Sequence, residues 1–279
     1  MKVINFGSLN IDYVYRVHGF VRPGETISAT SFSRFTGGKG LNQSIALARA
    51  GASTIHAGMI GKDGVFLLDA LRESGVDCSA VAVDPMLPSG HAVIQVADSG
   101  ENAIVLYPGT NHQITHELIL QTLSLAEAGD ILLLQNEISA IPEIMREASK
   151  RKMRIFINPA PMTDAVADYP LELADTLIVN ETEWEALNPR RLPHSINILQ
   201  TLGARGAVYN GSIRVPARRV DNVVDTTAAG DTFIGYFIAE LLQGRNVETA
   251  MNTATLASAW CIQRAGAAAS IPWRCELFG

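Results

Sequence analysis

Apolar residues along this chain follow two patterns that alternate. Short continuous apolar runs bounded by turn residues indicate buried strands, and longer stretches with apolar positions three or four residues apart indicate helices. The runs that we interpret as strands cover residues 3–6, 54–59, 131–135, 154–157, 176–179, 197–201 and 207–210. The predicted helices cover residues 41–50, 66–74, 116–125, 141–152, 232–243 and 247–265.

Alternation of strands and helices predicts an α/β fold, with a doubly wound, mostly parallel sheet that has helices on both faces. We expect it to form a single domain over residues 1–279. Gly51, Gly75 and Gly244 each follow a predicted helix. Glycine is favoured there because a helix commonly ends in a left-handed residue.

Two segments, residues 12–36 and 90–108, break this pattern because apolar and polar residues alternate with a period of two. Such alternation indicates strands with one covered and one polar face. We interpret the two segments as a small β-lid that stands off the main sheet. Its exposed edges would suit pairing with a second copy, so we expect a homodimer formed through the lid. Two irregular surface hairpins are the alternative.

Charge and cysteine content narrow the range of partners. Lys and Arg number 22 and Asp and Glu 28, for a net charge of −6, which disfavours general binding to nucleic acid or to an anionic membrane. No apolar stretch is long enough to span a membrane, and the first residues lack the pattern of a signal peptide. The three cysteines show no CxxC spacing, as expected of reduced thiols in the cytoplasm.

Residues 225–233, with the sequence DTTAAGDTF, carry the clearest sign of chemistry. Small residues precede a predicted helix, so several backbone N–H groups would be exposed at its N-terminus and could bind an anion. Ala228, Ala229 and Gly230 leave room for a phosphate to approach. Asp231 lies at the same opening, where its alternative role is to cap the helix.

Residues 36–43, with the sequence TGGKGLNQ, form a second glycine-rich segment before a helix. The spacing fits neither the P-loop nor the G-x-G-x-x-G dinucleotide motif. Lys39 and Asn42 are placed to hydrogen-bond a polyhydroxylated ligand. A tight turn at the start of a helix is the alternative explanation.

Taken together, these segments resemble the carbohydrate kinases of the ribokinase group, also called the PfkB family. The resemblance extends over nearly the whole chain, and its two most specific motifs are residues 37–43 and 225–233. The other matching segments are residues 7–12, 23–26, 100–102, 108–111, 158–161, 180–183 and 201–206.

The resemblance implies roles for individual residues near the sugar. Asp231 matches the catalytic base, and the N–H groups of Ala228, Ala229, Gly230 and Asp231 match the hole that holds charge on the transferred phosphoryl group. The positions that match sugar contacts are Asp12, Gly38, Lys39, Asn42 and Glu137, with Asn10 and Asp231 as further candidates.

The resemblance also implies a nucleotide site and two kinds of metal ion. Its nucleotide-binding positions are Asn180, Glu183, Thr201, Gly203, Gly206, Gly230 and Thr255. Glu183 would hold Mg²⁺ through water, although Asn180 and Glu183 could instead simply begin a helix. A monovalent cation, K⁺, would bind at Asp225, Thr227 and Ser270.

The expected activity is therefore ATP-dependent phosphorylation of the primary hydroxyl of a small sugar, with ribose as the expected substrate. Another sugar, a nucleoside, or a catalytically silent sugar-binding regulator are the alternatives. The sequence departs from the family pattern at Ala228, at Thr255, and in residues 187–196, a short segment with two prolines that predicts a truncated helix. These departures leave the phosphate donor open.

Overall fold

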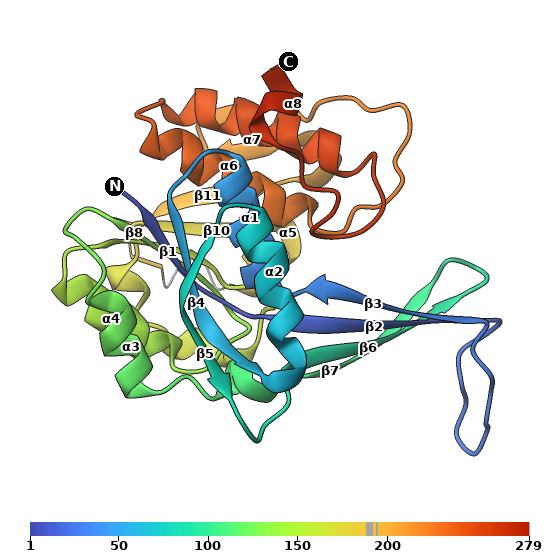
Figure 1. The fold of residues 1–279 in the computed structure, drawn as a ribbon. Coiled ribbons are helices and arrows are strands. Elements are labelled where there is room, and N and C mark those ends of the chain that lie inside the picture. The colour runs from blue at the N-terminus through green and yellow to red at the C-terminus, as the bar shows by residue number, and fades with distance from the viewer. Residues whose placement is uncertain (188–191, 194, 279) are drawn as a thin grey trace.

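The computed structural model describes residues 1–187, 192–193 and 195–278, and its centre is a large, mostly parallel sheet (Figure 1). Its nine strands lie in the order β13-β12-β11-β10-β9-β8-β1-β4-β5, and all pairings are parallel except β11–β12 and β12–β13. The bounds are β1 Val3–Phe6, β4 Thr54–Gly61, β5 Asp77–Asp84, β8 Ile131–Gln135, β9 Arg154–Asn158, β10 Thr176–Asn180, β11 Asn197–Thr201, β12 Ala207–Tyr209 and β13 Ile213–Val215.

Helices cover both faces of this sheet, as predicted. Along β8, Leu132 and Leu134 pack into a cluster with α3 (His116–Leu123) and α4 (Ile141–Lys150), whereas Ile131 and Leu133 pack into a cluster on the opposite face. The second cluster includes residues of α1 (Lys39–Arg49), α6 (Ala229–Leu242) and α7 (Val247–Cys261). The remaining helices are α2 (Val65–Glu73), α5 (Glu181–Ala186) and α8 (Arg274–Phe278). Within the described ranges, no helix has the length and apolar character needed to cross a membrane.

Every predicted strand and helix is present, with differences at the ends. Helix α6 begins at Ala229 rather than at 232, and α7 ends at Cys261 rather than at 265. Strands β5 and β13 were not predicted, because β5 is half-exposed and begins and ends with Asp, and β13 has only three residues. Gly51, Gly75 and Gly244 have φ values of 94°, 86° and 77°, which confirms the left-handed ends.

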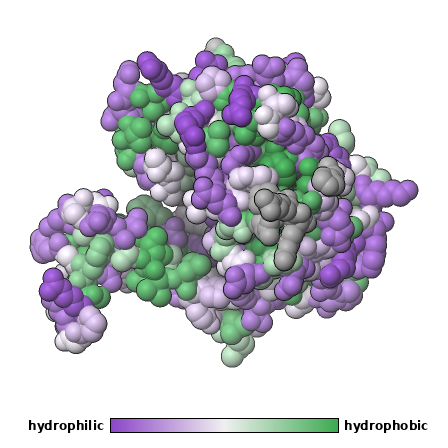
Figure 2. Space-filling model, turned by 180° about the vertical axis from the view of Figure 1, so that it is seen from behind, coloured by the Kyte–Doolittle hydropathy of each residue, from purple (hydrophilic) through white to green (hydrophobic). Residues whose placement is uncertain are grey.

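The lid is a four-stranded sheet that projects from the main body (Figure 1). Its order is β3 (Ser31–Gly37), β2 (Asn10–Val17), β6 (Gly90–Ala97) and β7 (Asn102–Tyr107). The two predicted segments join where β2 runs parallel to β6, so they form one sheet rather than two separate hairpins. Figure 2 shows apolar residues gathered on the lid. Those exposed there are Phe32, Phe35, Ile104, Val105, Leu106 and Tyr107.

Candidate active site

The glycine-rich segment passes from the lid into the body at the start of α1. Gly38 has a φ of 96° and Lys39 is the first residue of the helix, so the chain turns sharply between β3 and α1. Gly40 packs directly on the backbone after β1: a Cβ on Gly40 would lie 2.5 Å from Gly7 Cα, which leaves no room for one. The glycines therefore bring the first turn of α1 against the carboxyl end of β1.

Asp231 lies in the first turn of α6, facing this segment, and is only 7% exposed. It does not cap its own helix, whose N-cap residue Ala228 has a φ of 60° and makes no side-chain cap. Each carboxylate oxygen instead accepts a hydrogen bond from α1. Asn42 Nδ2 donates to Oδ2 at 3.1 Å, and Gln43 Nε2 donates to Oδ1 at 2.9 Å.

Backbone amides surround this carboxylate at the N-terminus of α6. Within the described residues, the N–H groups of Ala228, Gly230 and Asp231 have no protein acceptor, as expected of the first turn of a helix. Ala229 differs, because its N–H donates to the Thr226 carbonyl at 3.3 Å. Of the four amides that the sequence pointed to, three are thus free to bind an anion.

These groups share a cavity of about 200 Å³ at the carboxyl ends of β9, β10 and β11. It brings together seven of the predicted site residues, namely Lys39, Asn180, Glu183, Thr201, Ala228, Gly230 and Asp231. Asn158, Ala160, Thr226 and Ile234 also line it and were not among the predicted site residues. Asn158 could have been found from the sequence, because it ends a parallel strand at the edge where ligands bind in such sheets.

Two further carboxylates, Glu137 and Asp12, lie near each other beside the glycine-rich segment. Glu137 accepts hydrogen bonds from Ser8 Oγ at 2.5 Å and from the Lys39 N–H at 2.9 Å, and burial raises its pKa. Burial, with a smaller contribution from Glu137, raises the pKa of Asp12 to about 6. The nearby carboxylates, Asp231 foremost, raise the pKa of the Lys39 ammonium group. Gly37 leaves space for the Asp12 carboxylate, which a Cβ at that position would overlap.

The cost of burying the charged Asp12 carboxylate predicts that Asp12→Asn stabilises the protein at neutral pH. Because burial raises its pKa from 3.8 to about 6, this group favours folding below pH 3.8, and the contribution is lost as the pH rises through 6. The neutral variant should therefore unfold a few degrees higher than wild type near neutral pH, and the gain should shrink towards pH 4. Thermal unfolding followed by circular dichroism at both pH values measures this. A gain that does not change with pH would contradict the electrostatic explanation.

The other predicted sugar contacts differ in how free they are. Asn10 Oδ1 already accepts a hydrogen bond from Asn111 Nδ2 at 2.7 Å, which ties β2 to the loop after β7. Asn42 has a buried Oδ1 without a partner in the described part of the chain. The Asn42 side chain thus holds Asp231 through Nδ2, whereas its oxygen is enclosed by protein.

On the nucleotide side, Asn180 and Glu183 form a capping box at the start of α5. Glu183 accepts hydrogen bonds from the Asn180 N–H and Nδ2, both at 2.9 Å, and the Asn180 side chain accepts one from the Glu183 N–H. The helix-start explanation is thus correct, yet both residues line the cavity. Helix α5 ends at Ala186, while residues 188–191 and 194 of the predicted short segment lie outside the described residues.

The remaining nucleotide positions do not line this cavity. Gly203 and Gly206 lie in the turn between β11 and β12 with φ values of 53° and 96°. Thr255 is buried inside α7, where its hydroxyl donates to the Met251 carbonyl at 2.7 Å. The Thr255 hydroxyl is therefore already used within α7, and its role in binding the nucleotide stays a prediction.

The predicted cation residues come from two loops. Asp225 accepts hydrogen bonds from Thr227 N–H and Oγ1 at 2.9 and 2.6 Å and from the Gly266 N–H at 3.0 Å, which joins the loop before α6 to the loop after α7. Ser270 donates to the Ala267 carbonyl at 2.8 Å. Among the described residues no group of three or more His, Cys, Asp or Glu side chains could hold a metal.

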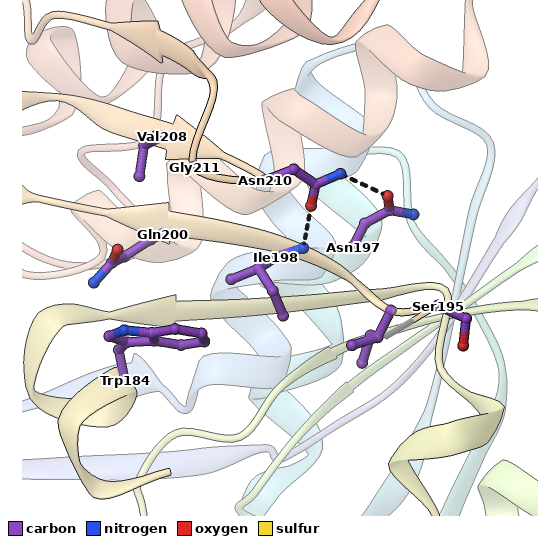
Figure 3. Close-up of a pocket in the computed structure, with 9 residues that line it drawn as sticks. Trp184, Ser195, Asn197, Ile198, Gln200, Val208, Asn210 and Gly211 are labelled. Carbon is purple, nitrogen blue, oxygen red and sulfur yellow. Dashed lines mark hydrogen bonds between the residues drawn. The ribbon is translucent and has the colours of Figure 1, made fainter. Parts of the chain in front are cut away.

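A larger hollow, of about 470 Å³, lies on the other side of α5 (Figure 3). Trp184, Ile198, Gln200 and Val208 face it, and Asn210 bonds to Asn197 and to the Ile198 N–H at its rim. It contains none of the predicted site residues and no charged side chain among those that line it. The smaller cavity, where Asp231, Lys39 and the free amides meet, is therefore the candidate active site.

Several known proteins are similar to this chain over nearly its whole length. The family model described as pfkB family carbohydrate kinase matches residues 1–274. A ribokinase from Staphylococcus aureus is 35% identical over 97% of this chain and 96% of its own. The crystal structure of Cryptococcus neoformans ribokinase in complex with ADP has a TM-score of 0.87 and 32% identity, covering 99% of this chain and 98% of that one. Arabidopsis thaliana ribokinase complexed with ribose and ATP has a TM-score of 0.86 and 28% identity, covering 99% and 97%.

Proposed function

This chain belongs to the pfkB family of carbohydrate kinases and is a sugar kinase, and from this premise we propose that it transfers the terminal phosphoryl group of ATP to the primary hydroxyl of ribose. The observation that carries the proposal is the meeting of a buried carboxylate, Asp231, with free backbone amides at one end of a cavity. The ligands named for the similar ribokinase structures, ADP, ribose and ATP, support the choice of substrates.

In the proposed reaction, Asp231 accepts the proton of the sugar hydroxyl as its oxygen bonds to the phosphorus and the bond to the leaving ADP breaks. Such a transfer is loose and in line, so the hydroxyl becomes acidic only as the new bond forms and a carboxylate is a strong enough base. The free N–H groups of Ala228, Gly230 and Asp231 would hold the charge on the phosphoryl oxygens. Lys39, in the same cavity, adds a positive charge.

The sugar would bind between the lid and the start of α1. Asp12 and Glu137 are acceptors, and Lys39 and Asn42 supply donors, a mixture that suits paired hydrogen bonds to neighbouring hydroxyls. Asn10 would contribute through the orientation of β2, since its side-chain oxygen is occupied by Asn111. Gly38 allows the backbone to approach the sugar closely.

ATP would lie over the ends of β10 and β11, near Asn180, Thr201 and the turn with Gly203 and Gly206. Mg²⁺ would come with the phosphates, and Glu183 could accept hydrogen bonds from its waters because each oxygen keeps a lone pair beyond the capping box. This ion supplies neutralisation of the phosphate charge. We place K⁺ in the loops joined by Asp225, with Thr227 and Ser270. The three cysteines are free thiols, which fits a cytoplasmic enzyme.

The experiment that tests this proposal measures ADP release with ribose, deoxyribose, fructose, tagatose and adenosine, in matched potassium and sodium buffers. Ribose should give the highest kcat/KM, and activity should rise in potassium. A preference for adenosine would favour a nucleoside kinase instead, and inactivity with every sugar would overturn the substrate assignment. Equal rates in the two buffers would remove only the K⁺ proposal.

We further propose that the lid pairs with the lid of a second copy. Val105 and Ile104 on β7 are 70% and 56% exposed, and burial of such residues drives association. Sedimentation velocity should therefore show a dimer, and Val105→Asp should shift it to monomer. The exposed change Val83→Asp on β5, a strand of the main sheet and not of the lid, serves as the control. A wild-type monomer at working concentration would contradict the proposal.

A further inference from the structure

A line of buried polar side chains leads from the middle of the main sheet to Asp231. Gln43 of α1 donates to Asp231 Oδ1 at 2.9 Å, and its Oε1 accepts a hydrogen bond from Gln135 Nε2 at 2.6 Å. Gln135, the last residue of β8, also donates to Asn5 Oδ1 on β1 at 2.9 Å. These three amide side chains are fully buried. Gln43 comes from α1, Gln135 from β8 and Asn5 from β1, so the line joins the helix to two neighbouring strands of the sheet.

The hydrogen bonds of this line can run in only one donor-to-acceptor direction, and Asn5 at the end far from Asp231 fixes it. Asn5 Nδ2 donates to the Gly40 carbonyl and to Ser44 Oγ, both at 2.8 Å, so Asn5 Oδ1 is left to accept. Ser44 Oγ in turn contacts His56 Nδ1 at 2.7 Å. Since Asn5 Oδ1 and Gln43 Oε1 both accept from Gln135 Nε2, turning over any one amide would bring two oxygens together.

The direction matters at Asp231, because only the NH₂ group of Gln43 can stabilise a carboxylate. If Gln43 turned over, its oxygen would face Asp231 Oδ1 at a fully buried position, where unpaired polar groups are costly. A buried Gln with no fixed partner could adopt either orientation. Gln135 removes that freedom by donating to Gln43 Oε1, and Asn5 holds Gln135 in place by accepting from the same Nε2.

We propose that Gln43 is a positioning residue for Asp231, and that Gln135 and Asn5 hold Gln43 in the productive orientation. The proposal rests on the role of Asp231 as the base. Asn42 holds Oδ2 and Gln43 holds Oδ1, so the plane of the carboxylate is set by two donors from one turn of α1. The remaining lone pairs then face the cavity that would receive the sugar hydroxyl.

The first test is Gln43→Leu, which keeps the volume and removes the donor. A base displaced by about 1 Å can cost roughly 100-fold in rate, so kcat should fall by about that factor while KM for sugar and ATP stays within about threefold. Gln135→Leu should lower kcat by a smaller factor, roughly tenfold, because Gln43 remains but can turn over. The smaller change keeps the proposal testable if Gln43→Leu does not fold.

The second test is the double variant, Gln43→Leu with Gln135→Leu. If Gln135 acts through Gln43, the double variant should have the kcat of Gln43→Leu alone, because there is no amide left to orient. Effects on kcat that multiply would overturn the proposal, as would a Gln43→Leu enzyme with kcat within about twofold of wild type. Urea unfolding of each variant separates lost stability from lost turnover.

Thr54→Val is the matched control. It removes a buried hydroxyl that donates to the Ala52 carbonyl at the start of β4, and this hydroxyl is not part of the line of amides. It should lower stability and leave kcat unchanged. The assay also separates two kinds of failure. If Asp231→Asn abolishes turnover but Gln43→Leu does not change it, only the positioning role is wrong. If Asp231→Asn keeps full turnover, the base itself is wrongly assigned.

Discussion

Replacing Asp231 by Asn is expected to lower kcat by roughly 100- to 10,000-fold, the range that general-base catalysis contributes. The amide has nearly the same shape, but its NH₂ group cannot accept, so it keeps only one of the two hydrogen bonds from Asn42 and Gln43. It also cannot accept the proton of the attacking hydroxyl. Sugar affinity should stay within about threefold of wild type, because the substitution changes only one of several contacts to the sugar, from a charged to a neutral hydrogen bond. The effect would therefore lie almost entirely in kcat.

Turnover is measured by ADP release and sugar affinity by calorimetry. Asp168→Asn, an exposed residue in a short 3₁₀ turn, is the control and should behave as wild type. If Asp231→Asn lowered sugar affinity by more than tenfold and left kcat unchanged, Asp231 would be a sugar-binding residue and not the base. Undiminished turnover would exclude it as the base.

Gly40→Ala is expected to prevent folding or to destabilise the protein by several kcal/mol. The added methyl group would overlap the backbone of Gly7 and Ser8, and backbone atoms cannot move aside as a flexible side chain can. Separating α1 from β1 would also disturb Asn5, whose Nδ2 donates to the Gly40 carbonyl. The expected effect is much larger than the usual cost of a single added methylene.

Chemical unfolding in urea measures this change, with Gly19→Ala as the control. Nothing lies within 4 Å of a Cβ at Gly19, so that variant should unfold at the same urea concentration as wild type or slightly above it. A Gly40→Ala protein with wild-type stability would mean that the contact between α1 and β1 can relax.

The layered fold could be predicted from the sequence because its signals are local. Buried parallel strands such as β8 and β9 are continuous apolar runs, and the glycines after α1, α2 and α6 mark helix ends. The edge strand β5 was missed because it has water on one side and therefore lacks such a run. Pairing of β2 with β6 could not be predicted, since nothing local in either strand specifies its partner.

Only those residues of the candidate site that belong to short sequence motifs could be predicted. Asp231, Lys39 and the amides before α6 lie in two motifs, and the structure places them in one cavity. Gln43 belongs to the same motif, but its role depends on Gln135 and Asn5, which are distant in sequence and look like ordinary strand residues. Asn180 and Glu183 cap a helix, as the simpler explanation predicted, and they also line the cavity, while their role in binding the nucleotide stays a prediction.

The parallel pairing of β2 with β6 also constrains the order in which the chain can fold. Asn10 pairs with Gly90 and Val17 with Ala97, so the sheet cannot be completed from neighbouring residues. During synthesis the first hairpin, β2 with β3, must wait with the other edge of β2 unpaired until the second has left the ribosome. Non-local contacts of this kind form slowly, so the lid would be a late-forming part of the molecule and the segment most exposed to aggregation before it closes.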